Sequence, residues 1–298
     1  MKILITGASG FIGKKVLDKL KNKYGASNIW ILSGSRNERE AEDNIIASLE
    51  YRFDDNYFDR FDFDVVIHIG AFIPKSSGDA NNITASTSNI RNTETLINAL
   101  GKCQNLKKII FISTIDVYQE MDEVLTELTP TIPQTLYGWS KLYCERIITT
   151  FCTMKGIQYD ILRLGHVYGE GEEKYRKVMP VMVKSAIKNE DIQIYGDGEA
   201  LRTFIYIDDV ADAIVNTVEL ADSDVINIVG NKAVTINKLA SLIVNLAESE
   251  SGIIHIPTEN QNRNLVFDNK KLMSTLLSAL TPLDEGLRNE INYMKRKL

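Results

Sequence analysis

Short apolar runs alternate with longer stretches of helical periodicity, and this alternation constrains the fold more than any other feature of the sequence. Several of the runs are apolar at successive positions, as strands buried on both faces of a parallel sheet are. The predicted strands are KILIT (2–6), NIWILS (28–33), DVVIHIG (64–70), KIIFIS (108–113), YDILRL (159–164) and VINIVG (225–230). The predicted helices cover 11–23, roughly 80–102, 136–155 and 208–220. This order predicts an α/β fold with a doubly wound parallel sheet and right-handed crossovers.

The rhythm changes after Gly165, where short strands, loops and small helices follow. The run at 225–230 is expected to return to the main sheet. We therefore expect a sheet domain and a smaller, discontinuous lobe, with a cleft between them. The sheet domain would comprise 1–165 and about 206–230, and the lobe about 166–205 and 231–298.

Composition and charge exclude several classes of protein. The 298 residues are 44% apolar and 25% charged, which is ordinary for a globular protein, and the net charge is −6. Lys and Arg form no block, so a nucleic-acid surface is not expected. No apolar run approaches the roughly 20 residues of a membrane span. The first ten residues, MKILITGASG, already read as a strand and a turn, so we expect no cleavable signal and a cytoplasmic protein.

The cysteines and histidines give no sign of a metal site. Cys103, Cys144 and Cys152 fall in helical patterns, without CxxC or Cys/His ligand spacing. We expect three reduced, free thiols and no metal.

A glycine triplet follows the first predicted strand and opens the first predicted helix. In ILITGASGFIGKKVL, Gly7 permits a tight turn, Gly10 lets backbone approach a pyrophosphate, and Gly13 lets the helix pack closely on the sheet. Free N–H groups at the helix start would bind the phosphates. This is the Rossmann arrangement for a dinucleotide, with contacts assigned to Gly7, Gly10, Phe11, Ile12 and Gly13.

The end of the second strand favours NADP over NAD. An NAD site usually has Asp or Glu there, to hold the ribose 2′-hydroxyl. This chain reads ILSGSRN, with no carboxylate, and Ser35 and Arg36 could bind a 2′-phosphate. We expect NADP, with NAD as the alternative.

Tyr137 and Lys141, in TLYGWSKLYCE, lie four residues apart on a predicted helix and so share one face. An isolated Tyr-x-x-x-Lys pair is more often packing than chemistry. The rest of the chain has to decide between the two readings.

Six motifs in sequence order resemble the extended short-chain dehydrogenases/reductases that act on nucleotide-sugars. They are GASGFIG, DVVIHIGA, FISTIDVY, YGWSK, LRLGHVYGEG and GDGEALRTFIYIDDVADA. The resemblance covers nearly the whole chain. It implies that Tyr137 is a general acid/base, that Lys141 supports it and holds the cofactor ribose, and that Thr114 orients the substrate oxygen.

The resemblance also implies a nucleotide-sugar substrate held by the second lobe. His166 stands where many relatives have Asn near the diphosphate, and Arg202 and Arg263 resemble the family's diphosphate-binding arginines. Asn89 is expected to bond to backbone near the active-site strand, and Arg163 to be structural. Dimerisation through a two-helix face is common in the family, so we expect a homodimer.

The catalytic strand end narrows the reaction. Related 4,6-dehydratases usually carry Thr-Asp-Glu there, but this chain has Thr114, Ile115 and Asp116, which argues against water elimination. The absent acid after the second strand favours reduction of a nucleotide-4-keto-6-deoxyhexose at C4, with 4-epimerisation as the alternative. Two further hypotheses are a non-catalytic NADP sensor on the same scaffold and a related enzyme that acts on an apolar ketone.

Overall fold

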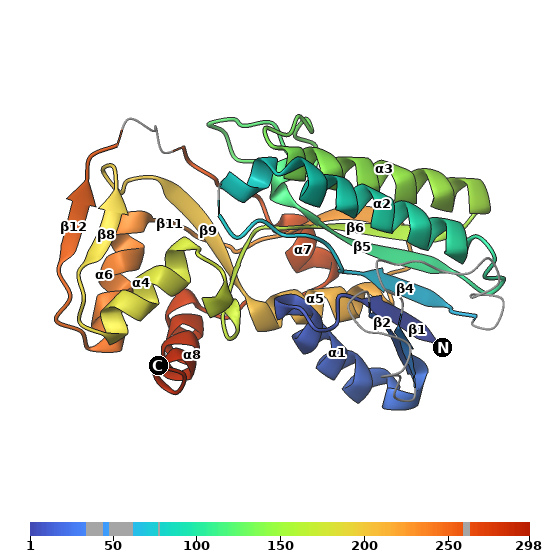
Figure 1. The fold of residues 1–298 in the computed structure, drawn as a ribbon, viewed down its shortest axis with the longest axis horizontal. Coiled ribbons are helices and arrows are strands. Elements are labelled where there is room, and N and C mark those ends of the chain that lie inside the picture. Colours follow the sequence, from blue (N-terminus) through green and yellow to red (C-terminus); the bar gives the residue numbers. More distant parts are fainter. Residues whose placement is uncertain (34–43, 48–61, 77, 259–262) are drawn as a thin grey trace. The chain divides into compact units, whose positions relative to one another are not determined.

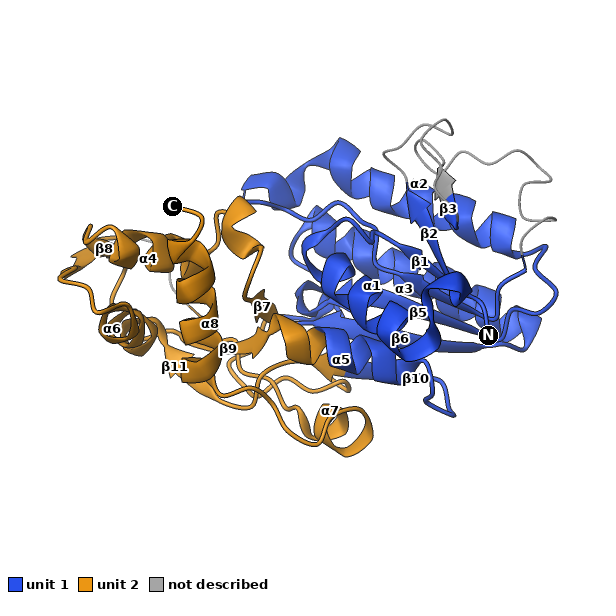
Figure 2. Cartoon of the chain, turned by 90° about the horizontal axis from the view of Figure 1, so that it is seen from below, with its two compact units in different colours: residues 1–119, 130–164, 211–226 blue, residues 120–129, 165–210, 227–298 orange. Residues whose placement is uncertain are grey.

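The computed structural model describes residues 1–33, 44–47, 62–76, 78–258 and 263–298 (Figure 1). Within them the chain forms two compact units, each assembled from separate stretches of sequence (Figure 2). The first comprises 1–119, 130–164 and 211–226, and the second comprises 120–129, 165–210 and 227–298.

Residues 120–129 lie in the second unit, although the sequence placed them in the sheet domain. The physical reason is that this segment pairs, as a strand would, with residues 266–268 of the second unit. Leu125 forms a parallel bridge with Phe267, and its amide donates to the Val266 carbonyl (2.9 Å).

The central sheet confirms the predicted doubly wound architecture. In the part of the chain that the structure describes it has seven strands, in the order β10-β6-β5-β4-β1-β2-β3. The pairs from β3 through β6 are all parallel. The strands are β1 (Ile3–Thr6), β2 (Ile29–Ser33), β3 (Ile45–Ala47), β4 (Val65–His68), β5 (Lys108–Thr114), β6 (Gln158–Leu164) and β10 (Asp224–Ile228).

Helices cover both faces of this sheet (Figure 1). One face carries α2 (Ile83–Leu100) and α3 (Leu136–Lys155), and the other carries α1 (Phe11–Tyr24) and α5 (Ile207–Thr217). An ion pair between Lys19 and Asp212 (2.7 Å) joins α1 to α5. Short 3₁₀ turns, η1 (Ala26–Asn28), η5 (Gly78–Asn81) and η6 (Ile115–Val117), link the elements.

Helix α2 is shorter than the helix that the sequence predicted. The predicted helix over about 80–102 is observed as η5 followed by α2, which begins at Ile83. Asn82, between η5 and α2, has an extended backbone, and its Oδ1 atom accepts from the Ala85 amide (3.0 Å), as an N-cap residue does. Local capping chemistry therefore fixes the start of α2.

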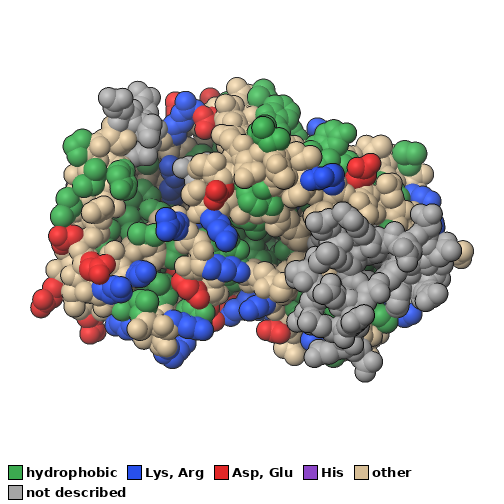
Figure 3. Space-filling model, viewed as in Figure 1, with side chains coloured by type: hydrophobic (Ala, Val, Ile, Leu, Met, Phe, Trp, Pro, Cys, Tyr) green, Lys and Arg blue, Asp and Glu red, His purple; other side chains and the backbone are tan. Residues whose placement is uncertain are grey.

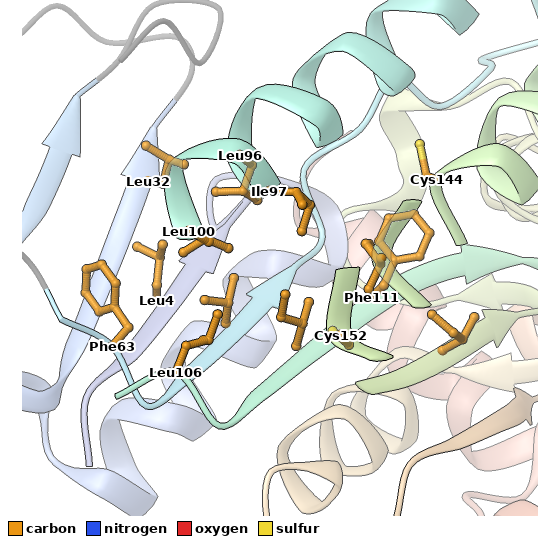
Figure 4. Packing of buried hydrophobic residues seen from close by; sticks show 14 residues of the cluster. Leu4, Leu32, Phe63, Leu96, Ile97, Leu100, Leu106, Phe111, Cys144 and Cys152 are labelled. Carbon is orange, nitrogen blue, oxygen red and sulfur yellow. The ribbon is translucent and has the colours of Figure 1, made fainter. Parts of the chain in front are cut away.

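The core on the α2/α3 face is packed from strands and helices together (Figure 4). Strands β1, β4 and β5 are buried along their whole length, which explains their continuous apolar runs. Each fully buried Leu, Ile or Phe side chain there contributes about 1.5–3 kcal/mol. The cluster includes Leu4, Phe111, Leu96, Leu100, Cys144 and Cys152. The three cysteines are not joined in a disulfide, and Cys103 follows α2 rather than lying in the helix as the sequence predicted.

The second unit consists of small sheets and helices. Strands β7 (His166–Tyr168), β9 (Leu201–Tyr206) and β11 (Ala233–Thr235) form one sheet, and β8 (Ile192–Tyr195) pairs with β12 (Ile253–Ile256). The helical elements are η7 (Glu172–Lys174), α4 (Val178–Ile187), α6 (Ile236–Ala247), α7 (Lys270–Thr275) and α8 (Leu283–Lys295). None of the helices among the described residues is long and apolar enough to cross a membrane.

Candidate active site

A tight glycine turn joins β1 to α1. Gly7 has a left-handed backbone (φ 71°), and a Cβ atom on it would meet the Gly70 backbone nitrogen at 2.6 Å. The Gly10 amide donates to the Gly7 carbonyl (3.0 Å), which closes the turn. A Cβ atom on Gly13 would overlap that same carbonyl, so the start of α1 packs on the turn backbone rather than on the sheet.

The residues at this turn fit the pyrophosphate of a dinucleotide. Gly10 is the N-cap residue of α1 and brings no side chain that competes for the first helical N–H groups. The Phe11 and Ile12 side chains are buried, and the first turn of α1 carries no acidic residue. The glycine turn and helix dipole therefore offer an anion site next to the carboxyl end of the parallel strands. The other cofactor candidates, Ser35 and Arg36, lie outside the described residues.

Thr114 ends β5 at the carboxyl edge of the sheet. It is 7% exposed, and its Oγ1 atom accepts from the Asp116 amide (3.2 Å), which caps η6. Ile115 is buried and Asp116 is exposed. The hydroxyl group is thus held at a fixed point by its own backbone turn.

Tyr137 stands in the first turn of α3, which packs against that same turn. Thr135 caps α3 by accepting from the Gly138 amide (3.1 Å), and Asn81 Oδ1 accepts from the Leu136 amide (3.1 Å). A Cβ atom on Gly138 would overlap the Asp116 carbonyl oxygen, so only glycine lets the two backbones approach this closely. Tyr137 itself is 7% exposed.

Lys141 follows one helical turn later and is 3% exposed. Its Nζ atom lies 4.2 Å from the centre of the Phe111 ring on β5, a cation–π contact. Burial lowers the pKa of the Lys141 ammonium to about 8, and Cys144 and Glu145 oppose that shift. Lys141 is therefore still mainly cationic at neutral pH.

Asn89 on α2 ties the loop after β4 to the start of α3. Its Oδ1 atom accepts from the Phe72 amide (2.7 Å), and its Nδ2 atom donates to the Phe72 carbonyl (3.2 Å) and to Ser140 Oγ (3.2 Å). Ser140 Oγ donates to the Tyr137 carbonyl (2.7 Å), and the Phe72 ring meets the Tyr137 ring edge-on at 6.4 Å. The expected backbone bonds of Asn89 are present, and Ser140 extends them to the candidate acid/base.

A buried histidine that the sequence did not connect to the site braces the strands beneath it. His68 on β4 lies 2.7 Å from Thr6 Oγ1 through Nδ1 and 3.0 Å from Thr93 Oγ1 through Nε2. Thr6 Oγ1 also accepts from the Gly70 amide (2.9 Å). Burial, with repulsion from Lys141, lowers the pKa of His68 to about 3, so the ring is neutral and joins β1, β4 and α2 by hydrogen bonds.

His166 begins β7 in the second unit. Its Nδ1 atom is buried and makes no hydrogen bond within the described residues. Burial lowers the pKa of His166 to about 4, with the positive charges of Arg202 and Lys177 adding to the shift. The imidazole is therefore neutral at pH 7 and has one nitrogen available to a ligand. Lys177 is a neighbour that the motifs did not single out.

Arg202 and Arg263 meet beside this histidine strand. The Arg202 Nη1 atom donates to the Leu201 carbonyl (2.8 Å) and to the Arg263 carbonyl. The Arg263 side chain, 56% exposed, forms an ion pair with Glu120. The second unit thus gathers two guanidinium groups and a neutral histidine, which are groups suited to phosphate oxygens.

Each of the two sets of predicted residues lies within a single unit. The first unit holds the glycine turn with Thr114, Tyr137 and Lys141, and the second holds His166, Arg202 and Arg263. Sequence patterns missed the supporting roles of Gly138, Ser140 and Glu145. Gly138 and Ser140 lie in the motif YGWSK, but neither the motif nor the helical period shows which distant residues these three contact.

Comparison with known proteins finds relatives that match most of the chain. A model of the NAD dependent epimerase/dehydratase family matches residues 3–229. A Methanocaldococcus jannaschii protein, provisionally named UDP-glucose 4-epimerase, is 29% identical over 301 residues, which cover 98% of both chains.

Solved structures extend the likeness to the whole chain. The UDP-glucose 4-epimerase of Thermotoga maritima, solved with UDP-glucose, is 26% identical with a TM-score of 0.86, and the match covers 100% of this chain and 99% of that one. The UDP-glucuronic acid 4-epimerase of Bacillus cereus, solved with NAD, is 25% identical with a TM-score of 0.82 over the same shares.

Proposed function

Because the chain belongs to the NAD dependent epimerase/dehydratase family, we propose that it is an NAD-dependent nucleotide-sugar 4-epimerase. The observation that carries the proposal is the buried pair of Tyr137 and Lys141, one helical turn apart at the start of α3. This pair occurs in a chain whose nearly full-length relatives are named as 4-epimerases.

Epimerisation replaces the 4-keto reduction that the sequence favoured. That preference rested on the loop at Ser35 and Arg36, which lies outside the described residues. The relatives named above act on intact UDP-sugars by name, and the Bacillus cereus enzyme was solved with NAD. These comparisons support NAD as the cofactor and C4 inversion as the reaction.

The chain's own residues account for acid/base catalysis at C4. Tyr137 takes the proton from the 4-hydroxyl group. After the 4-keto sugar has rotated to present its opposite face, Tyr137 returns a proton to the C4 oxygen. A free tyrosine has a pKa near 10, and lowering it by three units requires about 4 kcal/mol of preferential phenolate stabilisation. The Lys141 ammonium supplies part of this, and Thr114 holds the sugar oxygen in line. A bound nicotinamide dinucleotide would take up the hydride from C4 and give it back.

The residues after Thr114 disfavour a 4,6-dehydratase. Ile115 is buried and has no exchangeable proton, and Asp116 is exposed. Water elimination needs a second acid/base pair at this position, and the chain does not supply one there.

The nucleotide diphosphate is assigned to the second unit. His166, with its buried and unpartnered Nδ1 atom, and the guanidinium groups of Arg202 and Arg263 supply donors for phosphate oxygens. An apolar ketone offers these groups no anionic acceptor, which argues against the non-nucleotide alternative. A non-catalytic sensor would have no use for Tyr137 and Lys141 buried side by side on one helix face.

We also propose a homodimer, formed through the outer face of α2 and α3. A groove of about 470 Å³ on this face is lined mainly by apolar atoms. Ile83, Trp139 and Tyr143 are 71%, 50% and 57% exposed there. Figure 3 shows hydrophobic side chains along the edge where α3 lies in Figure 1. A contiguous apolar face of this kind is typical of a subunit interface. The cytoplasmic location stays a prediction.

The reaction is tested with purified protein, UDP-glucose and UDP-glucuronic acid, with NAD but no added reductant. An epimerase converts each accepted substrate to a mixture of C4 epimers, detected by proton NMR, without net production of NADH. Stoichiometric consumption of NADPH with a 4-keto substrate, and no interconversion, would favour the reductase instead.

A further inference from the structure

Three ionisable side chains follow one another along the inner face of α3. Tyr137, Lys141 and Glu145 are spaced by four residues, so each lies one helical turn beyond the last. All three are buried, at 7%, 3% and 4% exposure. The first two belong to the proposed chemistry, while the third has had no role so far.

Glu145 is fully engaged by the two strands beneath it. Its Oε1 atom accepts from Ser113 Oγ (2.5 Å) and from Arg163 Nε (3.0 Å), and its Oε2 atom accepts from Arg163 Nη2 (2.7 Å). Ser113 and Arg163 are partners in the pairing of β5 with β6. One carboxylate therefore joins three elements through a bidentate ion pair and a hydroxyl bond.

The position of this junction bears on the site. Ser113 directly precedes Thr114, and Glu145 lies one turn from Lys141. The Arg163 guanidinium also lies 4.8 Å from the centre of the Tyr118 ring, just after η6. The same contacts that hold α3 on β5 thus hold Lys141 and Tyr137 in register with Thr114.

We propose that Glu145 is a positioning residue for catalysis, whose carboxylate ties α3 to β5 and β6 next to Thr114 and, one helical turn from Lys141, helps that buried side chain to stay protonated. A buried ammonium is costly unless an opposite charge is near. The carboxylate one turn away supplies that charge, and Ser113 and Arg163 prevent it from moving away.

Among the groups named around Lys141, Glu145 is the one that carries a negative charge. His68 on β4 is neutral, since burial lowers its pKa to about 3, and burial raises the pKa of the Cys144 thiol, which also stays neutral. Toward this region α2 contributes the uncharged Asn89 and Thr93, and β5 the Phe111 ring. Tyr137 and Tyr118 are phenols, and Arg163 is a cation that disfavours a charged lysine. Burial lowers the pKa of Lys141 to about 8, and Cys144 and Glu145 oppose that shift.

The direct test is the pKa of Lys141 in the folded protein. Carbon-13-labelled lysine is followed by NMR across a pH series, and Lys141→Met assigns the resonance. Glu145→Gln keeps the size of the side chain and removes its charge, so the Lys141 pKa is expected to fall by about one unit. An unchanged pKa in Glu145→Gln would overturn the proposal.

A matched control separates charge from packing. Arg163→Lys keeps both charges at the junction but loses the bidentate geometry. It should lower the melting temperature and leave the Lys141 pKa near the wild-type value. If it lowers that pKa as much as Glu145→Gln does, packing rather than the carboxylate charge sets it, and the proposal fails. Should Glu145→Gln not fold, the pair Glu145→Gln with Arg163→Gln restores an amide contact. Its reference is Arg163→Gln alone, because both variants then lack the Arg163 charge. The Lys141 pKa should be lower in the double variant than in Arg163→Gln, and equal values would overturn the proposal.

The catalytic consequence rests on the proposed function and has its own readout. The alkaline limb of the kcat/KM profile, where Lys141 loses its proton, should move to lower pH in Glu145→Gln and not in Arg163→Lys. A wild-type protein without epimerase turnover would refute the proposed function, while the NMR titration still decides the role of Glu145. Normal wild-type turnover with an unmoved alkaline limb in Glu145→Gln would contradict the role of Glu145 alone.

Discussion

Gly138 lies so close to the Asp116 carbonyl oxygen that a Cβ atom on the glycine would overlap it. This contact sets the start of α3 against the turn that follows Thr114. The distance between Tyr137 and Thr114 therefore depends on the absence of a methyl group at position 138.

Gly138→Ala should therefore reduce turnover more than it reduces cofactor binding. The added methyl group pushes α3 away from η6 and costs about 1–3 kcal/mol of stability. Misplacing Tyr137 relative to Thr114 by about 1 Å should lower kcat by about 100-fold. Steady-state kinetics and NAD titration measure the two effects. Gly101→Ala, at the end of α2, is the control and should leave kcat unchanged.

Tyr137→Phe removes only the phenolic oxygen. We expect kcat to fall by at least about 100-fold, because general acid/base catalysis contributes that much, while NAD binding stays within a few-fold. Tyr143→Phe, on the exposed side of the same helix, should behave as wild type. Undiminished activity of Tyr137→Phe would refute the assigned role.

Arg202→Ala tests the assignment of the diphosphate to the second unit. A charge-assisted bond to phosphate contributes about 1.5–3 kcal/mol, so the Kd for UDP-glucose should rise by about 10- to 100-fold. The Kd for NAD should stay unchanged, as calorimetry with each ligand can show. Arg288→Ala, an exposed arginine on α8, is the control. An equal loss of affinity for both ligands would mean that Arg202 is misassigned.

Trp139→Asp places a charge on the proposed subunit face. We expect sedimentation velocity to show a monomer where the wild type is a dimer, because an unpaired carboxylate cannot be buried in an apolar interface. Leu128→Asp changes another exposed apolar side chain, 94% exposed and outside α2 and α3, and should leave the dimer intact. A wild-type monomer at micromolar concentration would contradict the proposed interface.

Glu290→Gln should change how stability depends on pH. The carboxyl group is 1% exposed, and neither oxygen has a hydrogen-bond partner within the described residues. Burial, with repulsion from Glu172 and Glu173, raises the pKa of Glu290 to about 8. The folded protein therefore keeps a proton that the unfolded chain releases above about pH 4.3, and stability falls as the pH rises toward 8.

The glutamine variant has no proton to lose, so it should be more stable than wild type at pH 8 by about 1–3 kcal/mol and similar to it near pH 4. Urea unfolding at the two pH values measures the difference. Glu285→Gln, on the exposed side of α8, is the control. Parallel pH profiles for wild type and Glu290→Gln would show that the group is not protonated in the folded state.

The sequence could predict the parts of this protein that depend on local pattern. The parallel strands and the glycine turn follow from short-range chemistry, and α3 begins and ends where its periodicity placed it, at Leu136 and Lys155. The Tyr137/Lys141 pair was visible for the same reason, since both residues lie on one helix.

The support of the site could not be predicted in this way. Glu145 meets Ser113 and Arg163 from two other elements, and the pairing of Asn89 with Phe72 depends on how α2 packs. No periodicity encodes such contacts. Both the predicted cofactor and the predicted reduction depended on Ser35 and Arg36 in one loop. Two loop residues do not determine which reaction an active site catalyses.

The interleaving of the two units along the chain has an evolutionary consequence. Because the backbone crosses from one unit to the other at 119, 129, 164, 210 and 226, no single recombination event could exchange the second unit for that of another protein. New substrate preferences in such a chain must arise by point substitutions or short insertions. Directed evolution of its selectivity should accordingly favour saturation of chosen positions over shuffling of large fragments.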